Sequence, residues 1–322
     1  MLAHVARRVA LAGFTVAAAL VVTFTLLTLA PGDPLLLLLD SRELSADAIA
    51  QLRAAYALDR PPLERFGHWV LALARGDLGW SIARQQPVQE ILQRAMPNSL
   101  VLCGAAALLS LTVGSALGAW QGAHADSRAE RASSLATLSL FAVPEFVLAL
   151  LLLLCFAWQL GWLPASGVRD DFARYLPLGA QLVDRARHLV LPVAALALVG
   201  TAVVSRYQRA AMLSAIHEPF VRAARARGAS NRRTLIRHAW RASLLPIVTL
   251  GGLYLPALVG GAFFVERAFS WPGMGSALAD AVLARDYPVV LAIVAVGSIA
   301  TAVGALVADL LAPLVDPRVR NG

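Results

Sequence analysis

A basic segment in the second half of the chain has the residue types needed to dock on another molecule. It contains Arg222-Ala-Ala-Arg-Ala-Arg-Gly228, and nine arginines lie between Arg206 and Arg241 against a single acid, Glu218. Guanidinium groups bind carboxylates and phosphates, and small alanines on a helix let another surface approach closely. Long apolar runs flank the segment on both sides. The pattern therefore predicts a docking loop between two membrane spans.

Glu145 is a second candidate for chemistry, because an ionisable side chain inside an apolar run is costly and marks a functional position. A carboxylate there can face an aqueous pathway and bind the cationic end of a substrate. The alternative is that Pro144 breaks the helix and Glu145 starts the next one in a wetter place. Pro256 is a further pathway candidate, since a proline kink can act as a gate or as a fixed bend.

Composition excludes several other kinds of chemistry. All 28 basic residues are arginine, so the chain has no lysine for a P-loop or for a Schiff base. His188 and His217 have no partners at metal-ligand spacing, and no nucleophile lies beside a base. We therefore expect no catalytic, cofactor or metal site in this chain. Nucleic-acid binding is not expected either, because the arginines concentrate in loops that flank the membrane.

Membrane-spanning helices must position these residues. Of the 322 residues, 58% are hydrophobic and 15% are charged, which is less charge than a soluble domain of this size carries. A helix satisfies its own backbone in lipid, and the alternating segments of a β-barrel are absent from the sequence. The sequence thus predicts an all-α polytopic membrane protein with six transmembrane helices. The predicted spans are about Val9–Ala30, Leu100–Ala119, Leu135–Leu160, Leu189–Ser205, Pro246–Val265 and Val289–Leu311.

The distribution of arginine orients these spans. The N-terminal tail, the loop after span two, the 206–245 loop and the C-terminal tail together carry fifteen arginines. Because arginine is retained on the cytoplasmic side, we expect a multi-pass inner-membrane protein with both termini in the cytoplasm. The predicted units are the tail and first span (1–30), an extracytoplasmic helical segment (31–99) and a five-helix core (100–322) that contains the cytoplasmic 206–245 loop.

The extracytoplasmic segment and span two carry local signals of their own. Ser45 opens an amphipathic helix that runs to about Tyr56, and Leu63–Ala74 is a second helix. We expect these helices either to lie on the membrane surface or to cover an aqueous pathway. Span two has small residues four apart, which let helix backbones approach closely. They are Ala106, Ser110, Gly114 and Gly118.

The 206–245 loop has the signals of two short helices joined by a turn. Pro219 suits the first turn of a helix that Gly228 ends, and Ser230 or Asn231 caps the second helix. The alternative to docking is that the arginines hold the loop at anionic lipid headgroups. The residues expected to form the docking surface are Phe220, Val221, Ala223, Ala224, Ala226, Arg227 and Gly228.

The loop resembles the EAA motif of ABC-importer permeases, with its Ala-Ala pair, its glycine and a later Leu-Pro pair that ends at Pro246. Arg222 stands where that motif has Glu, as in the branch that handles peptides and nickel. Seven further motifs follow in the order of that branch. They are Pro31-Gly-Asp-Pro34, Leu58-Asp-Arg-Pro61, Gly76-Asp-Leu-Gly79, Arg206-Tyr-Gln-Arg209, Trp271-Pro-Gly-Met-Gly275, Arg285-Asp-Tyr-Pro288 and Asp316-Pro-Arg318. The chain resembles the first (B-type) permease of a dipeptide/oligopeptide/nickel-type ABC importer over nearly its whole length.

This resemblance implies a type I ABC-importer permease architecture and a transmembrane subunit that forms half of the pathway for di- or oligopeptides. The implied partners are a second homologous permease, two ATP-binding cassette subunits or one fused pair, an extracytoplasmic substrate-binding protein and membrane lipid. ATP and Mg would bind to the ATPase subunits and not to this chain. The 218–230 helix would couple this subunit to an ATPase.

Three alternatives stay open from the sequence. The first is a permease of the same family for nickel or another small solute. The second is an ion-coupled secondary transporter, which would show inverted repeats and buried ion-site carboxylates. The third is a membrane-embedded enzyme, which would need paired catalytic groups.

Overall fold

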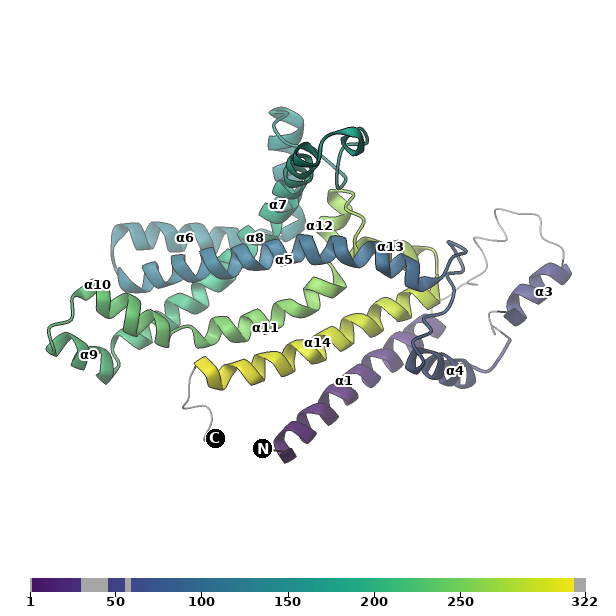
Figure 1. The fold of residues 1–322 in the computed structure, drawn as a ribbon, viewed down its shortest axis with the longest axis horizontal. Helices are drawn as coiled ribbons and strands as arrows, with labels where there is room; N and C mark the ends of the chain where they lie inside the picture. Colours follow the sequence, from purple (N-terminus) through teal and green to yellow (C-terminus); the bar gives the residue numbers. More distant parts are fainter. Residues whose placement is uncertain (1, 30–45, 56–58, 316–322) are drawn as a thin grey trace.

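The structure, a computed structural model, describes residues 2–29, 46–55 and 59–315, and its regular elements there are helices (Figure 1). The all-α class predicted from the sequence is confirmed for these residues. In chain order the helices are α1 (Leu2–Leu29), α3 (Ala46–Ala55), α4 (Pro62–Ala74), α5 (Val88–Ala123), α6 (Arg128–Ala142), α7 (Glu145–Leu152), a π-helical extension of α7 (Leu153–Gln159), a short 3₁₀ turn (Ala173–Tyr175), α8 (Leu178–Ile216), α9 (Pro219–Ala226), α10 (Asn231–Arg233), a π-helical extension of α10 (Thr234–Trp240), α11 (Leu245–Gly260), α12 (Phe263–Ala268), α13 (Met274–Leu283) and α14 (Tyr287–Val315).

Four helices in the described part of the chain are long and apolar enough to cross a membrane. They are the Ala10–Leu29 part of α1, the whole of α5 and α8, and the Tyr287–Val307 part of α14. Two bent pairs, α6 with α7 and α10 with α11, raise the number to as many as six if each pair counts as one span. Predicted spans one, two, four and six therefore coincide with single helices, whereas spans three and five do not.

Span three, predicted as one helix over Leu135–Leu160, is two helices that meet at 100°. Val143 is extended, with ψ at 124°, and Pro144 precedes the first residue of α7. Proline pushes the residue before it out of the helical region and cannot donate a backbone hydrogen bond, which accounts for the break at this point. As Figure 1 shows, α7 leaves the long axis of the bundle here.

Span five, predicted to run from Pro246 to Val265, ends earlier than expected. Helix α11 stops at Gly260, because Gly261 has a φ of +79°, and the chain then starts the separate short helix α12. A positive φ is open to glycine at little cost and ends a regular helix. Pro256 falls within α11, but its side chain lies outside the described residues, so its predicted kink remains a prediction.

Helices α5 and α8 form the closest pair in the bundle, and the small residues of α5 lie in their interface. A Cβ added at Gly114 would come within 2.7 Å of Val204, and one at Gly122 within 2.7 Å of Met212. At Gly118 the added atom would clash with the Ser205 carbonyl oxygen. The four-residue spacing of small residues thus brings the two backbones into contact, as the sequence predicts.

The segment predicted to be extracytoplasmic contains α3 and α4, close to the helices expected there. Ser45, Tyr56 and the motifs at 31–34 and 316–318 lie outside the described residues, as does Leu58 at the start of its motif. The predicted unit boundary between 99 and 100 falls inside α5, which begins at Val88. The helix begins at Val88 because the backbone at Pro87, directly before it, is extended, with ψ at 134°.

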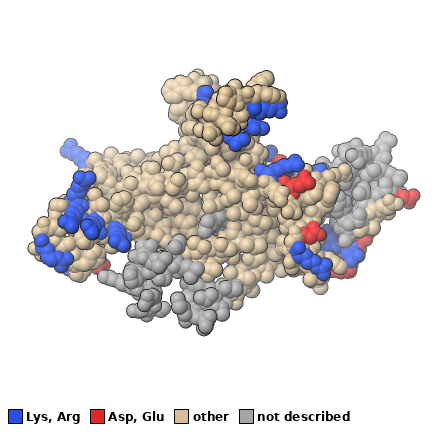
Figure 2. All heavy atoms as spheres, viewed as in Figure 1, with Lys and Arg blue, Asp and Glu red and all other residues tan. Residues whose placement is uncertain are grey.

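The two ends of the bundle differ in charge. Figure 2 shows arginines gathered at the end where Figure 1 places α9 and α10, whereas acids and arginines are mixed at the opposite end, near α4 and α13. Helices α1 and α14 pack against each other and run antiparallel (Figure 1). The start of α1 and the end of α14 therefore lie at the same end of this helix pair.

Candidate coupling surface and outer polar cluster

Helix α9 is formed by local signals that the sequence analysis identified. Glu218 is extended, Pro219 is the first helical residue, and Gly228 has a φ of +84° just beyond the helix. The Ala229 amide donates to the Ala224 carbonyl oxygen at 3.2 Å, which satisfies a carbonyl of the last turn. The Ser230 side chain then accepts from the backbone amide of Arg233, so the predicted cap of the second helix is confirmed.

The inner face of α9 packs against the chain itself. Val221 is 0% exposed and Ala224 is 3% exposed, and both lie three residues apart on one side of the helix. Val221 belongs to an apolar cluster with Met212 and Ala215 of α8, against which Phe220 is partly buried. Of the seven residues expected on the docking surface, Val221 and Ala224 therefore do not face outward in this structure. Tertiary packing, which residue type alone does not reveal, buries both side chains and places Val221 against α8.

The outer face of α9 and its turn remain exposed. Ala226, Arg227 and Gly228 are exposed and Ala223 is partly exposed. In the described part of the chain, the side chains of Arg222, Arg225 and Arg227 make no hydrogen bond or ion pair. We define the coupling surface by these residues: Arg222, Ala223, Arg225, Ala226, Arg227 and Gly228. It presents free cations beside small side chains.

A buried polar network fixes the loop to the bundle. The Gln208 amide Nε2 donates to Ser243 Oγ at 2.6 Å, and the Trp240 indole donates to Ser115 Oγ at 3.3 Å. Ser115 Oγ in turn donates to Gln208 Oε1 at 3.4 Å. The network joins α5, α8 and the end of the π-helical segment after α10. Sequence reasoning missed it, although Gln208 lies in the Arg206–Arg209 motif.

One of the nine loop arginines is already paired within the chain. Arg209 Nε lies 2.8 Å from Glu130 Oε1, and the Glu130 side chain is 3% exposed. Ser134 Oγ also donates to this carboxylate at 2.7 Å. The pair ties α6 to α8 next to the Gln208 network, so Arg209 contributes to the structure of the loop and not to its free positive charge.

The opposite end of the bundle contains a fully buried carboxylate. Glu266 is 0% exposed and accepts from Ser99 Oγ at 2.7 Å, from the Ala262 amide at 3.2 Å and from the Ser276 amide at 2.8 Å. A Cβ on Gly273 would come within 2.5 Å of this carboxylate, so only glycine fits there. Predicted span five ends one residue before Glu266, and Glu145 is the acid expected inside the membrane. Glu266 is therefore not among the residues expected from the sequence.

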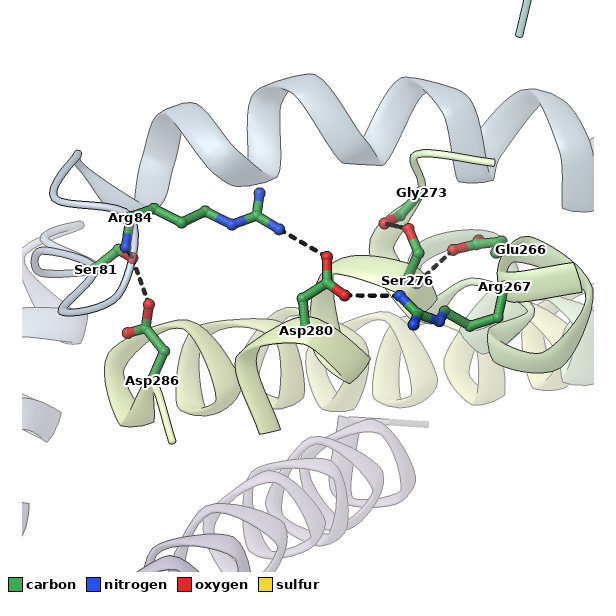
Figure 3. A network of polar contacts seen from close by, with 8 residues as sticks. All are labelled: Ser81, Arg84, Glu266, Arg267, Gly273, Ser276, Asp280 and Asp286. Atoms are coloured by element: carbon green, nitrogen blue, oxygen red, sulfur yellow. Dashed lines mark hydrogen bonds and ion pairs between the residues drawn. The ribbon is translucent and has the colours of Figure 1, made fainter. Parts of the chain in front are cut away.

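Around Glu266, further motifs that the resemblance had pointed out come together (Figure 3). The Asp280 carboxylate bridges Arg84 at 3.0 Å and Arg267 at 2.7 Å. Asp286 accepts from the Ser81 hydroxyl and, at 3.1 Å, from the Ile82 amide. We call this set the outer polar cluster: Ser81, Arg84, Ser99, Glu266, Arg267, Gly273, Ser276, Asp280 and Asp286. It joins the loop before α5 to α12, α13 and the start of α14.

A pocket of about 600 Å³ opens beside this cluster. Arg84, Arg94 and Arg267 line it together with Asp280 and Asn98. Two of the three guanidinium groups bind Asp280 and the third binds Glu90 at 3.2 Å, so the charges are satisfied within the chain. The pocket is therefore polar without a large excess of either charge.

Glu145 lies in a different environment from these paired carboxylates. It is partly buried in the first turn of α7, directly after Pro144. Within the described residues its carboxylate makes no hydrogen bond or ion pair. A negative side chain is favourable at a helix N-terminus, which explains its position without assigning it a ligand. Its role in a pathway remains a prediction.

Long apolar helices, one pair of them broken at a proline, carry a basic helical loop that is fastened to α5 and α8, and together they define an integral membrane protein. Comparison with known protein families identifies the class of membrane protein. The family described as the binding-protein-dependent transport system inner membrane component matches residues 84–321. The chain belongs to this family of transport permease subunits and is an inner-membrane protein.

Three relatives illustrate what the chain is similar to. It is 32% identical over 320 residues to the oligopeptide transport system permease protein AppB of Bacillus subtilis (strain 168), covering 99% of each chain. It is 34% identical over 335 residues to the di/tripeptide transport system permease protein DppB of Pseudomonas aeruginosa (strain UCBPP-PA14), covering 100% of this chain and 99% of that relative. The glutathione transport system permease protein GsiC of Pectobacterium atrosepticum is 33% identical over 305 residues, 94% of this chain and 93% of the relative.

Proposed function

We propose that this chain is the membrane subunit of an ATP-driven importer and forms half of a translocation pathway for di- or oligopeptides. The observation that carries the proposal is the end-to-end similarity to permeases named for oligopeptide and di/tripeptide transport. The relative named for glutathione transport, whose cargo is also a peptide, supports the same class of substrate. Nickel and other small solutes remain alternatives within the family.

The same proposal assigns six spans, with both termini and the 206–245 loop in the cytoplasm. Six crossings result if α6 and α7 form one span and α11, the second half of the other bent pair, forms another. The antiparallel packing of α1 and α14 supports an even number of crossings. The arginine-rich end at α9 and α10 then faces the cytoplasm, as positive residues favour. The outer polar cluster and α4 lie at the extracytoplasmic end.

Coupling to ATP hydrolysis takes place at the coupling surface in this proposal. ATP and Mg bind to two partner ATPase subunits, or to one fused pair, and their closure pushes on α9. Val221 anchors α9 to α8, and the Gln208 network holds the rest of the loop on α5 and α8. A push on the exposed face is thus passed to the two longest helices of the bundle. ATP supplies the differential affinity that such a conformational change requires.

A second homologous permease completes the pathway, and an extracytoplasmic substrate-binding protein delivers the peptide at the outer end. Glu145 lines the pathway in this proposal, where its unpaired carboxylate binds the ammonium end of a peptide. Glutamine keeps the shape of the side chain and removes its charge. A Glu145→Gln variant with unaltered affinity for every transported peptide would show that Glu145 does not line the pathway.

The coupling role is tested by Gly228→Arg in the assembled importer, reconstituted in proteoliposomes. We expect ATP-dependent uptake of a labelled dipeptide to fall by at least tenfold, because a side chain at φ +84° distorts the turn and adds bulk to the surface. Membrane insertion should remain intact. Normal uptake by this variant would overturn the docking role of α9.

Gly161→Arg is the matched control. Gly161 also has a positive φ, +63°, and nothing lies within 4 Å of an added Cβ there or at Gly228. Both changes strain the backbone by about 1 kcal/mol, as expected for a non-glycine residue in the left-handed region. Only Gly228→Arg touches the coupling surface, so a selective loss of uptake separates lost coupling from lost stability.

A further inference from the structure

A groove of about 430 Å³ lies between the end of α5 and the second helix of the cytoplasmic loop. Ala116, Ala119 and Trp120 of α5 form one wall, and Leu235 and Ile236 form the other. Arg232, an exposed residue, also lines it. The groove is therefore apolar inside with a cation on its lining, and it is separate from the outward face of α9.

The exposed face of α5 that leads to this groove has the length of a membrane crossing. Its large exposed apolar side chains begin at Leu100, continue through Leu108 and Val113, and end at Trp120. Twenty residues of α-helix span about 30 Å, which is the thickness of the hydrocarbon core of a bilayer. Tryptophan is enriched at the membrane–water interface. Trp120 thus places the groove at the level of the lipid headgroups.

The wall formed by the loop helix contains both apolar side chains and a charged one. Four residues of this wall line the groove together: Arg232, Leu235, Ile236 and Trp240. Within the described residues the Arg232 side chain makes no ion pair or hydrogen bond. A free guanidinium at the headgroup level, next to an apolar slot, matches a phosphate with an attached acyl chain.

We propose that this groove binds one anionic phospholipid of the cytoplasmic leaflet, with its phosphate at Arg232 and an acyl chain between α5 and the loop helix. Since the two walls belong to α5 and to the coupling loop, the bound lipid holds the loop against the bundle. The inference rests on the orientation given under the proposed function and is independent of the transported substrate.

The test uses photo-crosslinking in the complete importer. Ile236→p-benzoylphenylalanine is introduced, the complex is placed in nanodiscs of phosphatidylglycerol or of phosphatidylcholine, and lipid adducts are counted by mass spectrometry. We expect adducts with phosphatidylglycerol in at least threefold excess over phosphatidylcholine. Arg232→Gln should lower the phosphatidylglycerol adduct about fivefold, as the loss of one arginine near an anionic surface predicts. Ala116→Phe should lower both adducts by filling the slot.

Two matched variants serve as controls. Val113→Phe places the same phenyl ring one turn away on the exposed face of α5, and Arg128→Gln removes an exposed arginine that does not line the groove. Neither should change the adducts. A crosslink from position 236 to the second permease or to an ATPase would overturn the proposal, as would equal adducts with both lipids or no lipid adduct.

Failure of this inference and failure of the proposed function give different results. A missing lipid adduct leaves the effect of Gly228→Arg on dipeptide uptake unchanged. Conversely, an importer that does not transport dipeptides can still show the lipid adduct and its dependence on Arg232.

Discussion

The two ends of this molecule treat their charged residues in opposite ways. In the outer polar cluster, Glu266 is fully buried and accepts three hydrogen bonds, and Asp280 bridges two arginines. On the coupling surface, by contrast, Arg222, Arg225 and Arg227 have no partner within the described residues. The carboxylates of the outer polar cluster are satisfied within the chain, whereas these three arginines are exposed.

This difference indicates separate tasks for the two ends. Buried groups with all their hydrogen bonds made are rigid, because breaking any one bond leaves a partner unsatisfied. Here they lock α12 and α13 to α5 and to the start of α14. Exposed, unpaired arginines contribute little to folding and are free to bind another molecule. The end that contains the outer polar cluster therefore braces the helices, while the end that contains the coupling surface presents exposed cations.

The largest expected effect comes from Glu266→Ala. Its removal leaves the Ser99 hydroxyl and the amides of Ala262 and Ser276 without their acceptor, at a cost of about 3 kcal/mol or more. Thermal unfolding in detergent should show a large drop in the midpoint and less folded protein. Glu266→Gln, which keeps the shape and one acceptor oxygen, should lose less. An alanine variant that melts like the native chain would contradict the bracing role.

Asp280→Asn should have a smaller effect, although it removes the carboxylate from two ion pairs. The Asp280 side chain is 45% exposed, and Arg84 and Arg267 are similarly accessible. Ion pairs of this kind contribute about 0.5 kcal/mol each at most. We expect a small decrease of the melting midpoint. High salt screens the ion pairs of the native chain and should therefore reduce the difference between the native chain and the variant. A decrease of the melting midpoint as large as that of Glu266→Ala would contradict the comparison. It would show that burial does not determine how much each carboxylate of the outer polar cluster stabilises the fold.

The smallest effect on stability is expected from Arg227→Gln on the coupling surface. With no partner in the described residues to lose, the change should be below about 0.5 kcal/mol. ATP-dependent dipeptide uptake should nevertheless fall several-fold, because one of the free cations is lost. Uptake and melting are measured on the same reconstituted preparation. A destabilised variant with normal uptake per folded molecule would reverse the comparison between the two ends.

The sequence was a good guide wherever a local rule decides the structure. Pro219 starts α9, Gly228 ends it with a positive φ, and Ser230 caps the following helix, each at its predicted position. The apolar runs of α1, α5, α8 and α14 were also found, because length and hydropathy suffice to identify a membrane helix.

The errors arose where two distant segments meet. The sequence predicts span three as continuous, and a helix break at Pro144 is only the alternative explanation for Glu145. The two helices meet at 100°. The size of this bend depends on how α7 packs. Glu266 was overlooked because nothing nearby in the sequence announces that Ser99 and Ser276 surround it. Hydropathy places Glu266 just beyond a predicted span, where acidic side chains are commonly solvated.

What the sequence determined by itself is the class of protein, the two ends of α9 and the location of the basic loop. These follow from residue-level properties: hydrophobicity, the fixed φ of proline and the freedom of glycine. Only the tertiary structure decided that Val221 and Ala224 are buried while Arg227 faces outward, and that Glu266 is buried among donors. Such choices depend on which surface is nearest in space, and packing between distant segments sets that.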